Sequence, residues 1–274
     1  MSTNSATDRR GGLTRRQRAR LSRGAQYVVG ALVVLLVLLR MDWQQFSEAF
    51  FRLDIAGSMF PRVLAIGLVN TLIYTALAFV FGLFFGLLLA MMKLSPIGPY
   101  RWFATGYVEL FRGLPALVVL FMVAYGIPNA FSGFSFPGGI YGQVMVGLGL
   151  TASAYMCETI RAGIQAVPRG QVEAARTLGM NPSRTMVSIV LPQALRIIIP
   201  PLTNEIILLI KDSSLAYVVG VTANQYELTK FSADFLNRKV NPTPLIVGAL
   251  LYLSITLPLS SLVRRLERTY AKAR

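Results

Sequence analysis

The sequence predicts an all-α membrane protein with six transmembrane helices, and three observations predict this class. Hydrophobic residues make up 54% of the chain and charged residues only 14%, whereas soluble globular domains are about 25% charged. Apolar runs near the roughly 20 residues that a helix needs to cross a bilayer recur along the chain. The formal net charge of +15 falls mainly between those runs, as the positive-inside rule expects of a membrane protein.

Each expected span is an apolar run bounded by polar or turn residues. A cleaved signal peptide is the alternative interpretation of the first run, but the polar segment 40–43 follows it instead of a small-residue cleavage signal. In the second run Gly82 and Gly86 form a small-xxx-small pair, which lets helices approach closely. The expected spans are residues 24–39, 63–92, 114–131, 140–159, 195–209 and 245–262.

The polar segments between these runs give the expected boundaries. The segment 100–112 is amphipathic and aromatic, so we expect it to lie along the membrane interface. The expected organisation is a basic cytoplasmic tail at 1–23, a first helix with an external segment at 24–61, a transmembrane domain at 62–263 with a cytoplasmic loop at 161–192, and a second basic tail at 264–274.

The distribution of lysine and arginine predicts the orientation. With six spans, the two tails and the loops at 93–112 and 161–196 lie on one side, and they hold 20 of the 27 basic residues. Because cytoplasmic loops carry the excess of basic residues, we expect both termini in the cytoplasm. The same distribution disfavours nucleic-acid binding, which needs one folded basic patch.

Composition also excludes common catalytic and metal centres. The chain has no histidine, which rules out a Ser-His-Asp triad. Its lone cysteine, Cys157, leaves the usual zinc ligand sets incomplete. We therefore expect no catalytic residue, no metal and no cofactor in this chain.

The segment 168–192 is the most informative part of the chain. Pro168 suits the first position of a helix, and good helix formers follow it. Gly179 stands where a left-handed C-terminal cap is wanted. Asn181 can then cap a second helix that begins at Pro182. The sequence thus predicts two short cytoplasmic helices joined by a sharp turn.

The first of these helices has the features of a docking element. Ala174 and Ala175 make one face shallow enough to enter a groove on a partner. We expect apolar contacts from Val172 and Leu178, with polar contacts at the edge.

This segment resembles the EAA loop of ABC importer permeases. The pattern is Glu-Ala-Ala, three residues, Gly, nine residues and Ile-x-Leu-Pro, and every fixed position is present. In that family the loop docks on the ATPase and transmits its closure to the spans, so the resemblance implies a coupling role. The residues concerned are Glu173, Ala174, Ala175, Gly179, Ile189, Leu191 and Pro192.

Further segments resemble the permeases for polar amino acids, the histidine, glutamine, glutamate and arginine group. They lie at 109–115, 158–164, 192–196 and 204–215. One departure is Leu114, where that group often has threonine. The resemblance covers about residues 67–263 and implies a five-helix core to which the first helix is added.

The resemblance also implies the partners. The chain contains no Gly-x-x-x-x-Gly-Lys-Ser/Thr motif, so ATP must be bound by a separate ATPase subunit. We expect a second permease subunit, identical or related, an external substrate-binding protein and a polar amino acid as substrate. The expected location is the bacterial cell membrane, in contact with lipid.

Ionisable and polar groups within spans are candidates for the substrate path. Each has a structural alternative: a local ion pair at the cytoplasmic end of the fourth span, a pairing of Glu205 with a neighbouring helix, or an interfacial ion pair at 211–212. The candidates are Glu158, Arg161, Asn204, Glu205, Lys211 and Asp212.

The expected function is therefore a permease subunit of an ATP-driven importer, not an enzyme. An ion-gradient-driven secondary transporter and an ABC importer permease for a different small solute are the alternatives. A membrane enzyme is disfavoured because carboxylates are not clustered in the spans.

Overall fold

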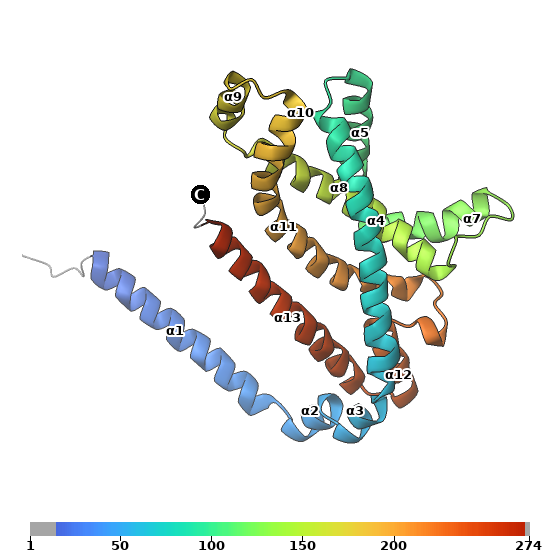
Figure 1. Cartoon of the computed structure of the whole chain (residues 1–274). Helices are drawn as coiled ribbons and strands as arrows, with labels where there is room; N and C mark the ends of the chain where they lie inside the picture. Colours follow the sequence, from blue (N-terminus) through green and yellow to red (C-terminus); the bar gives the residue numbers. More distant parts are fainter. Residues whose placement is uncertain (1–14, 272–274) are drawn as a thin grey trace, which may run out of the picture. The chain divides into compact units, whose positions relative to one another are not determined.

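The computed structural model describes residues 15–271, without the side chains of residues 17, 18, 21 and 271, and these residues form helices joined by short turns (Figure 1). The α-helices are α1 (Arg15–Arg40), α2 (Trp43–Phe50), α3 (Leu53–Met59), α4 (Val69–Leu94), α5 (Gly98–Gly113), α6 (Ala116–Phe121), α7 (Ile127–Ala130), α8 (Ile140–Gln165), α9 (Arg169–Thr177), α10 (Pro182–Thr185), α11 (Leu191–Asp212), α12 (Leu228–Lys239) and α13 (Thr243–Ala271). Three π-helical turns, η1 (Val63–Leu68), η2 (Met122–Gly126) and η3 (Met186–Val190), and two 3-10 turns, η4 (Ser213–Val218) and η5 (Ala223–Gln225), complete them.

The chain divides into two units, and the first comprises residues 1–51. Its helix α1 begins at Arg15, so part of the predicted basic tail at 1–23 is helical, while residues 1–14 lie outside the described residues. The apolar part of α1 is exposed on all sides within the structure, as expected of a helix that faces lipid. The side chain of Asp42 caps α2 by accepting a hydrogen bond from the backbone N–H of Gln45 at 3.0 Å.

The second unit comprises residues 52–274, and its centre is the close pairing of α4 with α8. A β-carbon added at Gly86 would stand 2.9 Å from Cβ of Met156, and one at Gly82 would stand 3.0 Å from Cβ of Ala152. A side chain at either glycine would force its neighbours to shift, so the predicted small-xxx-small pair is confirmed as the contact between these helices.

Helices α5 and α6–α7 form a broken pair that bends by 105° at residues 114–115. Ala104 and Val108 of α5 are buried in a cluster with Leu89 of α4 and Ile160 of α8. The segment 100–112 is therefore part of the helix bundle. Its apolar face packs against α4 and α8, while Trp102 and Phe103 are exposed.

Within residues 15–271, five helical segments are long and apolar enough to span a membrane, or six if the bent pair at 98–130 counts as one span. This confirms the predicted all-α membrane fold. Helix α11 continues through Pro200 and Pro201. Helix α13 extends to Ala271, so the second predicted tail is helical up to that residue, and residues 272–274 lie outside the described part.

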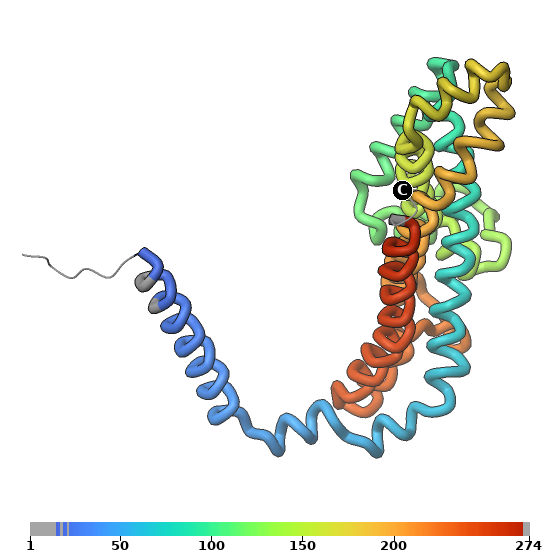
Figure 2. The backbone as a smooth tube through the Cα atoms, turned by 60° about the vertical axis from the view of Figure 1, so that its left-hand side comes forward, coloured from blue at the N-terminus to red at the C-terminus, as the bar shows by residue number. Residues whose placement is uncertain are grey.

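Two ends of the second unit differ in character (Figures 1 and 2). Helices α9 and α10 lie at the end where α4 finishes and α5 begins. At the other end, Asn70 of α4 donates hydrogen bonds through Nδ2 to the carbonyl oxygens of Asn224 and Tyr226, at 2.8 and 3.1 Å. The loop before α12 is thus fastened to the first turns of α4.

Candidate functional site

The segment 168–192 contains the two short helices that the sequence predicts, α9 and α10. Gly179 has φ = +85°, the left-handed conformation that ends a helix and favours glycine. The side chain of Asn181 accepts a hydrogen bond from the backbone N–H of Arg184 at 2.8 Å, and Pro182 takes the first position of α10. Pro168 is the N-cap of α9 rather than its first residue, one position from the prediction.

The two alanines of the motif face in different directions. Ala174 is exposed together with Glu173 and Leu178, the last with 84% of its surface accessible. Ala175 is buried, and Val172 packs against the cluster that contains Val190. Of the two alanines, only Ala174 is therefore accessible in the structure, because successive helical residues point about 100° apart. Val172 is half-buried.

A side-chain hydrogen bond ties α9 directly to the membrane helix α11. Nε2 of Gln193 donates both to Oε1 of Gln171 on α9 and, at 2.8 Å, to the carbonyl oxygen of Ile189. Ile189 lies in η3, and Leu191 and Pro192 open α11 immediately after it. Gln193 thus connects α9 with the first turn of α11.

Glu158 and Arg161 form an ion-pair network on the side of α8 that faces α4. The carboxylate of Glu158 accepts from the guanidinium of Arg161 at 2.6 Å and from the ammonium group of Lys93, the last basic residue of α4. Arg161 also donates to Gln165 at 2.6 Å. These contacts match the local pair that was the structural alternative for Glu158 and Arg161, and they add Lys93 to it.

A cavity of about 490 Å³, lined mainly by apolar atoms and also by charged side chains, lies between α8, α11 and the break that follows α5. Each helix lines it with one face, at the i, i+3, i+4, i+7 spacing of neighbours on a helix. Thr151 lies about 17 Å from the start of α8, close to the middle of that span. The lining residues are Leu148, Thr151, Ala152 and Tyr155 of α8, Glu205, Leu208, Leu209 and Asp212 of α11, and Arg112, Gly113, Leu114, Pro115 and Ala116 at the break.

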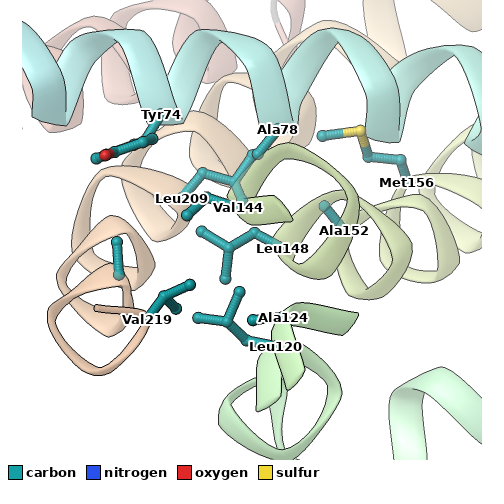
Figure 3. Packing of buried hydrophobic residues seen from close by; sticks show 11 residues of the cluster. Tyr74, Ala78, Leu120, Ala124, Val144, Leu148, Ala152, Met156, Leu209 and Val219 are labelled. Atoms are coloured by element: carbon teal, nitrogen blue, oxygen red, sulfur yellow. The ribbon is translucent and has the colours of Figure 1, made fainter. Parts of the chain in front are cut away.

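Packing of apolar residues beside the cavity fixes its walls (Figure 3). Leu148, Ala152 and Leu209 line the cavity and also belong to a buried cluster with Leu120 and Val144. Figure 3 shows Leu148 between Val144 on its own helix and Leu120 of α6. The polar side chains of the cavity are therefore carried on helices that the core holds in place.

Two of the predicted substrate-path residues meet in this cavity. Glu205 and Asp212 are half-buried, and neither has a hydrogen bond or a salt bridge with any residue in 15–271. Asn204 and Lys211, each one residue earlier on α11, are exposed and lie outside the cavity lining. Glu158 and Arg161 are likewise absent from the lining.

Sequence reasoning missed three polar residues of the cavity. The guanidinium of Arg112 lies 5.5 Å from the ring centre of Tyr155, a cation–π distance. Thr151 is 8% exposed, and its Oγ1 is the buried side-chain oxygen or nitrogen atom without a partner in the described part of the chain. The available signal was the break itself, because Arg112 stands in the last turn of α5, directly before Gly-Leu-Pro.

A bundle of membrane-length helices, an exposed helical loop tied to one of them and a mid-span cavity that carries charged side chains are together the features of a membrane transport subunit. The family model for the binding-protein-dependent transport system inner membrane component matches residues 82–272, and the chain belongs to that family. It is the permease subunit of an ABC importer, a membrane component that is not itself the ATPase.

Individual relatives agree with this family. The probable glutamine ABC transporter permease protein GlnM of Bacillus subtilis is 38% identical over 208 residues, which cover 74% of this chain and 93% of the relative. The arginine transport system permease protein ArtQ of Bacillus subtilis is 34% identical over 205 residues, covering 74% and 90%. A solved amino acid ABC transporter with histidines has a TM-score of 0.71 and 34% identity, covering 79% of this chain and 97% of that chain.

Proposed function

We propose that this permease carries a polar amino acid inward and that a separate ATPase drives it by docking on α9 and α10. The names of the relatives support an amino acid as the solute, and they differ in which one, glutamine for GlnM and arginine for ArtQ. The exposed face formed by Glu173, Ala174 and Leu178 supports docking, since a shallow helix face fits a groove on a partner.

The mid-span cavity supports the path of the solute. A zwitterionic amino acid needs a cation for its carboxylate and an anion for its ammonium group, and Arg112 with Glu205 or Asp212 offers this pair in one place. We place the substrate path here for this chain. The other predicted residues pack within the bundle, lie at the membrane interface or contact a neighbouring subunit. They are the exposed Asn204 and Lys211 and the paired Glu158 and Arg161.

The same function determines sidedness and assembly. We propose that both termini and the loop 161–192 face the cytoplasm, and that the protein lies in the cell membrane with a second permease subunit beside it. An external binding protein would deliver the solute to the opposite side. The position of α9 and α10 at the same end as Lys93 supports this arrangement (Figures 1 and 2), because basic residues mark the cytoplasmic side.

The substitution Ala174→Arg tests the docking of the ATPase. An arginine at this exposed position makes the shallow face bulky and charged, so we expect the ATPase to be lost when the complex is extracted in detergent and purified through the permease. Ala223→Arg is the control, because Ala223 is also exposed but lies before α12, at the other end of the second unit. Retention of the ATPase by the Ala174→Arg variant would contradict the proposed docking role.

A further inference from the structure

The charges of the mid-span cavity define more than a site for a zwitterion. One guanidinium, from Arg112, faces the cavity together with two carboxylates, from Glu205 and Asp212. Within residues 15–271, neither carboxylate has a hydrogen bond or salt bridge, and Arg112 has the ring of Tyr155 as its neighbour. Ionised groups inside a membrane protein are costly without a partner. A ligand whose charges are opposite to those of the cavity would therefore bind favourably in it.

The charges of the cavity distinguish between neutral, acidic and dibasic amino acids. The carboxylate of any amino acid can pair with Arg112, and its ammonium group can pair with one acidic residue. A neutral side chain then leaves the second carboxylate unpaired, and an acidic side chain brings a like charge beside it. A second cation on the ligand gives every charged group of the cavity an opposite partner.

The spacing on α11 fits two cations on one molecule. Glu205 and Asp212 are seven residues apart, which places them on the same face and about 10 Å apart along the helix. Lysine carries its side-chain ammonium at the end of a four-carbon stem, so one extended molecule presents a cation at each end of its chain. Thr151 on the facing helix also lines the cavity, and its buried Oγ1 has no hydrogen-bond partner within residues 15–271.

From this geometry we propose that the cavity binds dibasic amino acids, of the lysine and arginine type, in preference to neutral and acidic ones. Arg112 holds the carboxylate of the ligand, while Glu205 and Asp212 hold its two cationic groups. This assignment rests on the proposed function, because it takes the cavity to be the transport site of an amino acid importer.

A binding measurement without the external binding protein isolates this cavity. The permease, purified with its ATPase and placed in lipid nanodiscs, is titrated with radiolabelled L-arginine, and unlabelled L-lysine, L-glutamine and L-glutamate compete. We expect lysine to compete well, glutamine to bind about tenfold more weakly or worse, and glutamate not to compete. A charge-assisted hydrogen bond contributes about 1.5–3 kcal/mol, and 1.4 kcal/mol corresponds to tenfold in affinity.

Variants assign the preference to the two carboxylates. Glu205→Gln and Asp212→Asn are each expected to weaken arginine binding about tenfold or more and to reduce the ratio of arginine to glutamine affinity. Asp234→Asn is the matched control, because Asp234 pairs with Arg238 on α12, outside the cavity. Retention of the ATPase by each variant shows that it is folded.

Three results would overturn the assignment: glutamine that binds as tightly as arginine, an arginine-to-glutamine ratio unchanged in both variants, or no amino acid bound. ATP-driven amino acid uptake by the complete transporter separates this failure from a failure of the proposed function. If such uptake persists, only the dibasic preference is wrong. If the complete transporter takes up no amino acid, the proposed function and this assignment are wrong together.

Discussion

At the scale of single residues, the backbone conformation at position 179 favours glycine, which is the residue present there. Its φ of +85° lies in the left-handed region, where a residue with a β-carbon is disfavoured by about 1–2 kcal/mol. Gly179→Ala should therefore disturb the turn between α9 and α10, and we expect ATP-driven uptake to fall severalfold while the permease still reaches the membrane.

Gly170 offers the matched control for that turn. It lies in the same loop and does not have a positive φ, and no atom lies within 4 Å of the place that a β-carbon would take. Gly170→Ala is expected to leave uptake unchanged. Equal uptake by the Gly179→Ala variant and the natural protein would show that the turn does not transmit force.

Glu227 is the residue from which we expect a pH dependence of stability. It is fully buried, and its carboxylate accepts hydrogen bonds from the backbone N–H groups of Thr229 and Lys230 and from the hydroxyl of Tyr252. Burial raises the pKa of Glu227 above its ordinary value of 4.5, although the two backbone hydrogen bonds oppose the rise.

The sign of the effect follows from linkage. A carboxyl group with a raised pKa in the folded state stabilises the fold fully below its unfolded pKa, and this contribution is lost as pH rises through the folded pKa. We expect Tm in detergent to fall as pH rises from 4.5 through the raised pKa, and Glu227→Gln to remove most of that fall. The ion-paired Asp234 provides the control Asp234→Asn. An unaltered pH profile in the Glu227→Gln variant would count against this explanation.

Single residues also differ in whether their roles could be predicted from the sequence. The caps of the coupling loop could be predicted because glycine, asparagine and proline have strong local preferences at helix ends. Glu205 and Asp212 could be predicted because ionisable residues in a span are rare. Thr151 could not, since one threonine in an apolar helix has no distinctive pattern, and its unpartnered oxygen is a property of the folded chain.

At the scale of helices, the pairing of α4 with α8 depends on glycine. A side chain at Gly86 would collide with Cβ of Met156 and with the carbonyl oxygen of Ser153, at 2.9 and 3.0 Å. Overpacking of this kind costs about 1–3 kcal/mol. Gly86→Leu should lower Tm in detergent, whereas Gly106→Leu on α5, where nothing lies within 4 Å, should not. Equal Tm values for the two variants would refute the close contact.

The positions of α5 and α6 show why helices are harder to place than to find. The sequence predicted an amphipathic segment at 100–112 and a span at 114–131, and the structure has helices at both places. The sequence pattern of an apolar stripe, however, is the same whether the stripe faces lipid headgroups or other helices. Only the folded arrangement shows that Ala104 and Val108 are buried in the bundle, and so reveals the break that brings Arg112 into the cavity.

At the scale of the whole molecule, the proposed ATPase-docking loop and the proposed solute cavity are both connected to α11. The loop formed by α9 and α10 is tied to the start of α11 through Gln193, and the same helix carries Glu205 and Asp212 further along. A movement of α9 can therefore alter the cavity without any flexible linker between them. The number and order of the spans could be predicted from hydropathy. The connection of both α9 and the cavity to α11 could not, because it depends on contacts between residues that are distant in the sequence.

The central claim, that ATP hydrolysis by a partner drives this permease, is tested most directly by uptake into proteoliposomes. The permease is reconstituted with its ATPase and supplied with its binding protein outside, and amino acid uptake is measured with and without ATP inside, before and after ion gradients are collapsed. We predict uptake that requires ATP and survives the collapse of the gradients. Uptake that proceeds without ATP and stops when the gradients are collapsed would contradict the account and favour an ion-coupled transporter.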